Sequence, residues 1–377
     1  MKTIIKKVTT KNDLKKFIRF NYNLYKNNPY SVPDLFEDML SSFSDENPAM
    51  EFCQAEYFLA YQEEKIVGRV AAIINNRANE RWNEKTVRFG WIDFIDDIQV
   101  SKALIETVEQ YGKENGMTHI EGPLGFTDMD AEGMLLEGYE LPSTMATIYN
   151  YPYYPEHMEQ LGMEKAADWV EFRLIVPEKV PDKMVRISDI VKKKYGLHTV
   201  KLTRSLIKEK NYGQHIFDLI NESYKNLFGF TSLTQQQIDK YIKTYLGLLN
   251  LEMVSLIEDK EDELIGVGIS MGSLSVALQK AKGKLFPFGW YHILKALKIK
   301  QPDTLDLLLV GIKPEYQNKG VNSLLFTDLL PIYIKNGYKW CETNPELETN
   351  TAVQKQWEYF ETANTRRRRC YKKRISI

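Results

Sequence analysis

Hydrophobic positions along the chain follow two repeats, an alternation typical of strands and a three-to-four spacing typical of helices. Alternating stretches predict strands at 57–61 and 66–75, joined by a charged turn. A second pair of strands is predicted at 253–257 and 264–270, again joined by a charged turn. Each half of the chain is therefore predicted to contain a β-hairpin.

The elements after each hairpin come in the same order. In the first half, a strand at 87–94 precedes a helix that begins near Ile98. In the second half, an apolar strand at 305–310 precedes a helix with apolar positions at helical spacing from 321 to 329. The repetition indicates an internal duplication, so we predict two domains of the α/β class, each with a mixed α+β sheet.

Prolines and charged residues interrupt the pattern near 177–185, where we place the domain boundary. The first domain is then predicted at 1–180 and the second at 190–377. A stretch at about 271–302 interrupts the second domain and reads as two amphipathic helical pieces.

The composition is that of an ordinary globular protein, with a net charge of -1, 27% charged and 43% hydrophobic residues. No apolar run approaches the roughly 18 residues of a membrane span, and the N-terminal apolar stretch is too short for a secretory signal. We therefore expect a cytoplasmic protein that does not associate with membranes. The three cysteines are scattered, so neither a disulfide framework nor a metal site is expected.

The C-terminal segment 366–374 is rich in arginine and lysine. In a strand these side chains alternate between two faces, so about half of them would form one patch. We therefore predict an edge strand protected by charge and do not expect nucleic acid as a partner.

The most specific pattern is the segment 307–323, which reads LLLVGIKPEYQNKGVNS. It predicts a buried strand, a turn at Pro314, a loop and the start of a helix. The first turn of a helix leaves N–H groups unpaired and carries partial positive charge, so this loop can hold phosphate oxygens. The residues predicted to do so are Gln317, Asn318, Lys319, Gly320, Val321, Asn322 and Ser323.

This segment resembles the acyl-CoA-binding motif of the GNAT acyltransferase superfamily, Gln/Arg-x-x-Gly-x-Gly/Ala. Gln317 and Gly320 match the motif, whereas Asn322 stands where a small residue is usual. The resemblance implies two GNAT-like domains in tandem, with one acyl-CoA site in the second. The corresponding segment of the first half, 95–99, has two aspartates and no glycine, and carboxylates repel a pyrophosphate. We therefore predict that the first domain is a degenerate copy that shapes the acceptor site or supports the fold.

The resemblance implies transfer of an acyl group, expected to be acetyl, from acyl-CoA to the amine of a small molecule or peptide. In the superfamily, backbone N–H groups at a bulge in the motif strand stabilise the thioester oxygen. Val310, Gly311 and Ile312 occupy that place, and Gly311 suits a bulge.

An ammonium acceptor must lose a proton before attack, usually to a carboxylate. Glu342, on the strand after the motif helix, is the predicted base, with Glu346 and Glu348 as alternatives. The family tyrosine that protonates the thiolate follows an asparagine by seven residues, and here Trp357 stands at that spacing from Asn350. Tyr359 is then the candidate acid, although it faces another side of a helix.

Aromatic residues supply candidates for the acceptor pocket. In the insert these are Phe288, Trp290 and Tyr291, for which core packing of a helical hairpin is the alternative. In the first domain they are Tyr151 and Tyr153, which follow a glycine- and carboxylate-rich stretch that could equally be a packed loop.

Two other functions are compatible with the sequence. The chain could be a non-catalytic CoA-binding or scaffold protein, as Trp357 and Asn322 suggest. It could also be a Fem-type transferase that takes its donor from aminoacyl-tRNA, although that class predicts a long helical hairpin and a broad basic face. The sequence indicates neither the acceptor, the acyl length nor the oligomeric state.

Overall fold

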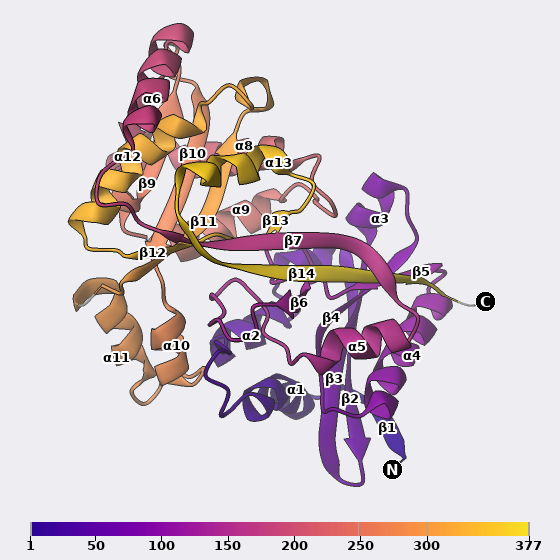
Figure 1. Ribbon diagram of the computed structural model, residues 1–377. Helices are drawn as coiled ribbons and strands as arrows, with labels where there is room; N and C mark the ends of the chain where they lie inside the picture. The colour runs from indigo at the N-terminus through magenta and orange to yellow at the C-terminus, as the bar shows by residue number, and fades with distance from the viewer. Residues whose placement is uncertain (1, 248, 300, 376–377) are drawn as a thin grey trace. The chain divides into compact units, whose positions relative to one another are not determined.

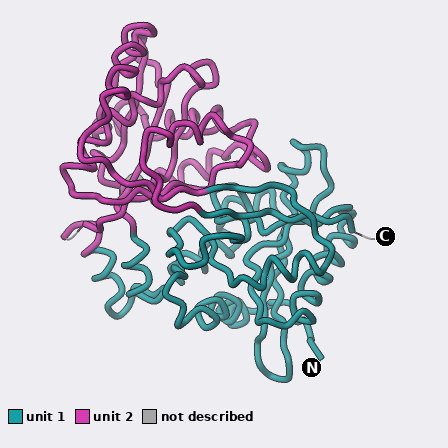
Figure 2. The backbone as a smooth tube through the Cα atoms, in the orientation of Figure 1, with its two compact units in different colours: residues 1–170, 274–294, 366–377 teal, residues 171–273, 295–365 magenta. Residues whose placement is uncertain are grey.

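The computed structural model describes residues 2–247, 249–299 and 301–375 (Figure 1). The chain forms two compact units (Figure 2). Unit 1 contains residues 1–170, 274–294 and 366–377, and unit 2 contains residues 171–273 and 295–365. Each unit has a mixed β-sheet with helices packed against it, which confirms the predicted α/β class. Residue 300 of the predicted insert lies outside the described residues.

The sheet of unit 1 has the strand order β1-β2-β3-β4-β5-β14. Neighbouring strands are antiparallel except β4 and β5, which are parallel. The bounds are β1 Thr3–Lys7, β2 Cys53–Gln62, β3 Lys65–Asn75, β4 Thr86–Phe94, β5 His119–Gly122 and β14 Thr362–Arg374, with the short β6 Met134–Glu137 also paired to β14.

Helices cover both faces of this sheet. Along β3, Val70, Ala72 and Ile74 enter one buried cluster, while Ala71 and Ile73 enter the other, as the two-residue repeat of a strand requires. The first cluster includes side chains of α4, and the second includes side chains of α1. The helices of unit 1 are α1 Lys11–Leu24, α2 Phe36–Ser42, α3 Asn76–Trp82, α4 Ile98–Glu114, α5 Tyr153–Gln160, α10 Ser275–Ala281 and α11 Gly289–Leu294, with the 3-10 turn η1 Pro48–Glu51.

The sheet of unit 2 repeats this order as β8-β9-β10-β11-β12-β7. Again the strands are antiparallel except one parallel pair, β11 and β12. The strand bounds are β7 Glu164–Ile175, β8 His198–Lys201, β9 Val254–Glu258, β10 Leu264–Gly272, β11 Thr304–Ile312, β12 Trp340–Glu342 and β13 Glu346–Leu347. The helices are α6 Asp182–Tyr195, α7 Arg204–Glu209, α8 Tyr212–Tyr224, α9 Gln235–Tyr241, α12 Asn322–Lys335 and α13 Thr351–Gln354, with short turns η2 Ile242–Leu246, η3 Leu251–Met253, η4 Lys295–Ile299, η5 Pro314–Tyr316 and η6 Lys355–Tyr359.

The parallel pair is equally short in both units. Thr86–Arg88 of β4 pairs with His119–Glu121 of β5. Thr304–Asp306 of β11 pairs with Trp340–Glu342 of β12. Among the described residues, β4 and β11 continue beyond these three residues without a strand partner on that side, so part of one edge of each strand is not covered by another strand.

The units differ from the two consecutive segments that the sequence suggests. The last strand of the unit 1 sheet is the C-terminal end of β14, and the last strand of the unit 2 sheet is the end of β7, through Arg173–Ile175. Residues 274–294 of the predicted insert belong to unit 1. The repeated order of elements in the sequence could not predict this arrangement, because it does not show which of the two sheets the last strand of each half joins.

The prediction of a charged edge strand at the C-terminus is wrong. Within unit 1, β14 pairs with β5 and with β6. Arg366 and Arg368 are buried and donate to the loop carbonyls of Pro142 and Ile148. A guanidinium has five donors, so it can bind loop carbonyls that no strand or helix pairs.

Among the described residues, no helix combines the length and the hydrophobicity that crossing a membrane requires.

Candidate functional site

The loop between β11 and α12 has the predicted order of strand, proline turn, loop and helix. Asn318 and Gly320 have left-handed backbones, with φ of 59° and 76°. Glycine adopts this conformation without strain, and asparagine tolerates it better than most residues. No side chain caps α12, whose N-cap residue is Val321. The loop therefore turns sharply and leaves the start of α12 uncovered by its own side chains.

The backbone N–H groups of residues 318–322 have no hydrogen-bond acceptor within the described part of the chain. They precede a helix of 14 residues, whose N-terminus carries partial positive charge. The Lys319 ammonium lies 5.4 Å from the Tyr195 ring centre and 5.6 Å from that of Tyr316. Unpaired amides, a helix terminus and a cation together fit an anionic group such as a pyrophosphate.

A second row of amides follows the open edge of β11. The carbonyls of Leu308, Val310 and Ile312 accept hydrogen bonds from Asn344 Nδ2 at 2.6 Å, Tyr224 Oη at 2.9 Å and Ser223 Oγ at 3.0 Å. In a strand, the N–H and C=O of one residue point to the same side. The N–H groups of Val310 and Ile312 therefore also face the open edge, which continues into the loop.

The bulge of β11 lies at Leu308 and not at Gly311, where the sequence suggested it. Ile269 pairs with Leu309 and Ser270 with Leu307, so Leu308 is the additional residue. Gly311 pairs regularly with Val267. A Cβ atom at Gly311 would lie 3.0 Å from Ile220 Cδ1, so this glycine allows α8 to approach the sheet closely.

Glu342, the predicted base, is buried where β11 and β12 are still paired. Its Oε1 lies 3.4 Å from Arg173 Nε, so its charge already has a cationic neighbour inside the sheet. Tyr359, the predicted acid, is half-buried in η6, and the Lys183 ammonium lies 5.0 Å from its ring centre. Neither position is on the open edge of β11.

Glu346 has the electrostatic properties that a general base needs. Burial raises the pKa of its carboxyl to about 8, although a hydrogen bond from Trp357 opposes the shift. Trp357 Nε1 lies 2.9 and 3.1 Å from the two carboxyl oxygens. Burial also raises the pKa of Tyr224 to about 12, with a smaller contribution from Glu346. Tyr224 donates to the Val310 carbonyl on the open edge, and its hydroxyl interacts electrostatically with Glu346.

Trp357 stands at the spacing at which the sequence resemblance led us to expect a tyrosine, and the structure shows what it contacts. The indole is buried and packs edge-on against Phe326 of α12, with ring centres 5.7 Å apart. Since an indole cannot give up its N–H proton to a thiolate, Trp357 orients Glu346 and is not an acid. Tyr224 was missed because one tyrosine at the end of an amphipathic helix has no distinctive pattern.

The same place in unit 1 is filled by the protein itself. The Phe94 N–H at the end of β4 donates to Tyr154 Oη at 3.1 Å, and Tyr153 Oη donates to the Phe94 carbonyl at 2.7 Å. Asp97 caps α4 by accepting from the Gln99 N–H, and the adjacent Asp96 side chain is 70% exposed. Carboxylates at the start of α4 disfavour an anionic group there, and the two tyrosines occupy the end of the β4 edge.

The predicted acceptor-binding aromatics lie in two different environments. Tyr151 and Tyr153 stack with their rings 5.7 Å apart, and Tyr151 also stacks on Tyr25. By contrast, the insert residues Phe288, Trp290 and Tyr291 are 73%, 44% and 45% exposed. The aromatic side chains of the insert therefore neither fill the core nor enclose a pocket by themselves.

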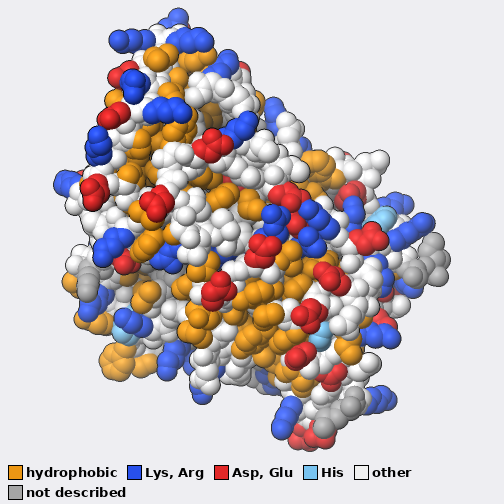
Figure 3. Space-filling view, in the orientation of Figure 1, with side chains coloured by type: hydrophobic (Ala, Val, Ile, Leu, Met, Phe, Trp, Pro, Cys, Tyr) orange, Lys and Arg blue, Asp and Glu red, His pale blue; other side chains and the backbone are white. Residues whose placement is uncertain are grey.

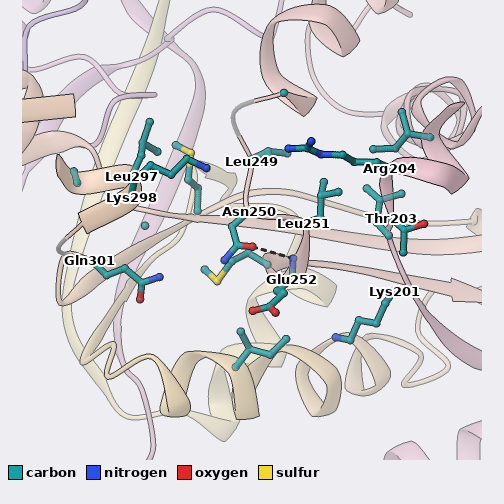
Figure 4. Close-up of a pocket in the computed structure, with 18 of the residues that line it drawn as sticks. Lys201, Thr203, Arg204, Leu249, Asn250, Leu251, Glu252, Leu297, Lys298 and Gln301 are labelled. Carbon is teal, nitrogen blue, oxygen red and sulfur yellow. Dashed lines mark hydrogen bonds between the residues drawn. The ribbon is translucent and has the colours of Figure 1, made fainter. Parts of the chain in front are cut away.

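Unit 2 also contains a cavity of about 1150 Å³ at the other end of α12 (Figure 4). Ile332 and Lys335 line it, so it lies about three turns along the helix from the loop. Its lining is apolar with several basic residues, and Asn250 accepts from the Glu252 N–H within it. None of the predicted site residues lines this cavity.

One group of possible metal ligands occurs among the described residues of unit 2, namely His198, Glu258 and Asp262. Their ligand atoms lie within 4.8 Å of one another. Glu258 already accepts a hydrogen bond from Tyr212. The turn that carries Asp262 also contains Glu263, which forms an ion pair with Lys313 after β11.

Comparison with known proteins identifies relatives of the whole chain, although no family model matches it. Protein YghO of Escherichia coli K12 is 28% identical, with 99% of this chain and 95% of that protein covered. A protein named bacterial ceramide synthase, from Caulobacter vibrioides NA1000, is 25% identical, with 92% and 91% covered.

Solved structures resemble the chain in fold. A tandem GNAT protein from the clavulanic acid biosynthesis pathway aligns with a TM-score of 0.56 at 12% identity, covering 100% of this chain and 99% of that one. A GCN5-related N-acetyltransferase from Sphaerobacter thermophilus aligns with a TM-score of 0.53 at 10% identity, covering 100% and 96%. Together with the repeated sheet order, these alignments confirm the predicted fold, and the chain is a tandem-domain protein of GNAT fold.

Proposed function

We propose that unit 2 is an acyl-CoA-dependent N-acyltransferase and that unit 1 has lost the donor site. The observation that carries this proposal is the row of unpaired amides at 318–322, which continues along the open edge of β11. In unit 1 the equivalent edge binds Tyr153 and Tyr154 instead. The strand edge is therefore accessible in unit 2, whereas side chains of the protein occupy the equivalent edge in unit 1.

The donor would bind along this row. The pyrophosphate would accept hydrogen bonds from the amides of 318–322, with Lys319 as a further cation. The amide groups of the pantetheine arm would pair with the N–H groups of Val310 and Ile312. The thioester would then reach the bulge at Leu308, where β11 and β12 separate.

The reaction requires one bond to form and one to break. The acceptor nitrogen attacks the thioester carbon, and β11 amides at the bulge stabilise the developing oxyanion. Glu346, in its ionised form, accepts the proton that the amine loses. The carbon–sulfur bond then breaks, and the CoA thiolate takes a proton, for which Tyr224, whose hydroxyl lies on this edge, is the proposed donor.

The identity of the acceptor is the finer part of the proposal. A ceramide is the amide of a fatty acid with a long-chain amino alcohol. Because a relative over nearly the whole chain is named a ceramide synthase, we propose a long-chain amino alcohol as the first acceptor to assay. A small polar amine with acetyl-CoA is the comparison reaction.

The proposal is tested in two stages. Calorimetric titration with acetyl-CoA and a long-chain acyl-CoA should show saturable binding by the wild-type protein. Release of free CoA thiol in the presence of an acceptor should then show turnover. Binding without turnover for any amine would favour the non-catalytic CoA-binding function. A folded wild-type protein that binds no acyl-CoA would overturn the donor site and leave the aminoacyl-tRNA-dependent alternative.

A further inference from the structure

The insert of unit 1 presents large hydrophobic side chains to solvent. Eleven such side chains are exposed in the described part of the chain, and six of them lie between 276 and 294. Phe286 and Phe288 are the most exposed, at 75% and 73%, and Trp290 and Tyr291 are 44% and 45% exposed. We call residues 286–291 the aromatic turn. A concentration of exposed apolar residues of this kind marks an interaction surface.

The aromatic turn is held in place by ordered contacts. Ala277, Leu278 and Ala281 of α10 are buried, and the Gly283 carbonyl accepts from the Phe36 N–H at 2.8 Å. Gln279 Nε2 donates to the carbonyls of Pro29 and Ser31. The insert is therefore anchored to unit 1 through one face, which leaves the aromatic side chains on the other.

Hydrogen bonds close the turn itself. The Trp290 N–H donates to the Leu285 carbonyl at 2.8 Å, and the indole Nε1 donates to the Pro287 carbonyl at 3.0 Å. A Cβ atom at Gly289 would overlap the Lys284 carbonyl oxygen, so the chain folds tightly back on itself. The phenylalanine side chains are thus displayed by a fixed backbone, which lowers the entropic cost of binding through them.

The charge of the insert is uniformly positive. Residues 274–294 contain three lysines and neither aspartate nor glutamate. Lys280, Lys282 and Lys284 are exposed in the segment that leads into the aromatic turn. Figure 3 shows hydrophobic side chains gathered at the position of α11 with basic side chains beside them.

We propose that the aromatic turn inserts into the surface of a membrane that contains anionic lipid, with the lysines on the lipid headgroups. Tryptophan and tyrosine favour the boundary between headgroups and acyl chains, and phenylalanine enters the apolar layer. Lysines attract the negative surface of such a bilayer. The combination of exposed aromatic residues and exclusively positive charge favours this partner over an uncharged protein surface. It describes peripheral binding without a membrane-spanning helix, and it departs from our expectation from the sequence that the protein does not associate with membranes.

This proposal stands independently of the acyl transfer. It rests on residues of the insert in unit 1, whereas the donor site is built from unit 2. The test therefore measures partition into vesicles and uses no turnover.

The experiment is co-sedimentation of the full-length protein with vesicles of phosphatidylcholine, with or without phosphatidylglycerol. The wild-type protein should bind the anionic vesicles more strongly, and less at high salt. Phe286→Ser with Phe288→Ser should weaken this binding by about tenfold or more, because two apolar rings are lost. Lys280→Gln with Lys284→Gln should abolish the preference for anionic vesicles. Ile4→Thr, which reduces an exposed apolar side chain elsewhere in unit 1, is the matched control.

Any of three results would overturn the proposal. The first is a folded wild-type protein that sediments with neither kind of vesicle. The second is equal sedimentation of the wild-type protein and the double serine variant. If the wild-type protein self-associates without vesicles and the serine variant does not, the aromatic turn is an interface between copies of this chain, and the membrane proposal fails. Acyl-CoA titration of the same variants shows separately whether the donor site is intact.

Discussion

The Glu346→Gln variant tests the electrostatics of the proposed site through the stability of the protein. Glutamine has the shape of a protonated glutamic acid and can still accept the hydrogen bond from Trp357. Burial holds the pKa of Glu346 at about 8, above its ordinary value of 4.5. The folded protein therefore keeps this proton at a pH where the unfolded chain has released it.

The difference between the folded and unfolded pKa values of Glu346 sets the sign and the size of the change in stability with pH. An acid whose pKa is raised by folding stabilises the native state fully below its unfolded pKa and loses that contribution as the pH rises through its folded pKa. With pKa values of 4.5 and about 8, the loss is about 2.5 kcal/mol between pH 5 and 7 and about 1.4 kcal/mol more by pH 9. Glutamine cannot ionise, so the variant should escape this loss.

The assay is urea unfolding of the wild-type protein and Glu346→Gln at pH 5, 7 and 9. Relative to the wild-type protein, the variant should become more stable by about 4 kcal/mol between pH 5 and 9. Glu358→Gln, which removes an exposed carboxylate from η6, is the control. A constant difference between Glu346→Gln and the wild-type protein across this range would refute the raised pKa. The same variant should lose acyl transfer, because about one Glu346 in ten is ionised at pH 7 and serves as the base.

Three further variants test other parts of the structure. Trp357→Phe removes the hydrogen bond that lowers the pKa of Glu346, so the pH–rate profile should move to higher pH; an unchanged midpoint would contradict the proposed role of Glu346. Asn318→Asp adds a carboxylate beside the unpaired amides and should weaken acyl-CoA binding by roughly fivefold to tenfold without lowering the unfolding temperature. Calorimetric titration with acyl-CoA measures the affinity, with Asn318→Ser as the control. Asp93→Asn leaves the buried Arg69 without its counter-charge and should lower the free energy of unfolding in urea by roughly 3 kcal/mol. A decrease below about 1 kcal/mol would show that this ion pair, whose N and O atoms lie 2.7 Å apart, contributes little to stability.

The parts of the fold that depend on neighbouring residues were predictable. The strand, turn and helix from 305 to 335 follow from apolar spacing, Pro314 and the loop glycine, all within one short stretch. The duplicated order of elements was predictable for the same reason, because each hairpin carries its own charged turn. The class of fold and the strand, loop and helix that form the candidate phosphate-binding segment could therefore be inferred from the sequence.

The parts of the fold and of the site that depend on residues distant in the sequence could not be predicted. The bulge at Leu308 is set by the register against β10, which the sequence of β11 does not contain. The arginines of β14 bind loop carbonyls more than 200 residues away, so their charge alone suggested an exposed edge. The sequence does not distinguish Glu342 from Glu346 as the candidate base, because the difference between them lies in the residues that surround each side chain. Arg173 neutralises the first, whereas burial beside Trp357 raises the pKa of the second.

The two units show how few residues decide whether this fold accepts a nucleotide-linked donor. In both sheets the parallel pair ends after three residues, and no strand among the described residues covers the rest of β4 or β11 on that side. In unit 1 the edge binds Tyr153 and Tyr154, and Asp97 caps the following helix. In unit 2 the helix has no side-chain cap, and the preceding amides are unpaired. Asn318 and Lys319 are exposed, so water can bind the loop amides, and an anionic ligand can replace that water without breaking an internal contact. In unit 1, side chains of the protein make hydrogen bonds to the equivalent edge, which is why we assign the donor site to unit 2 alone.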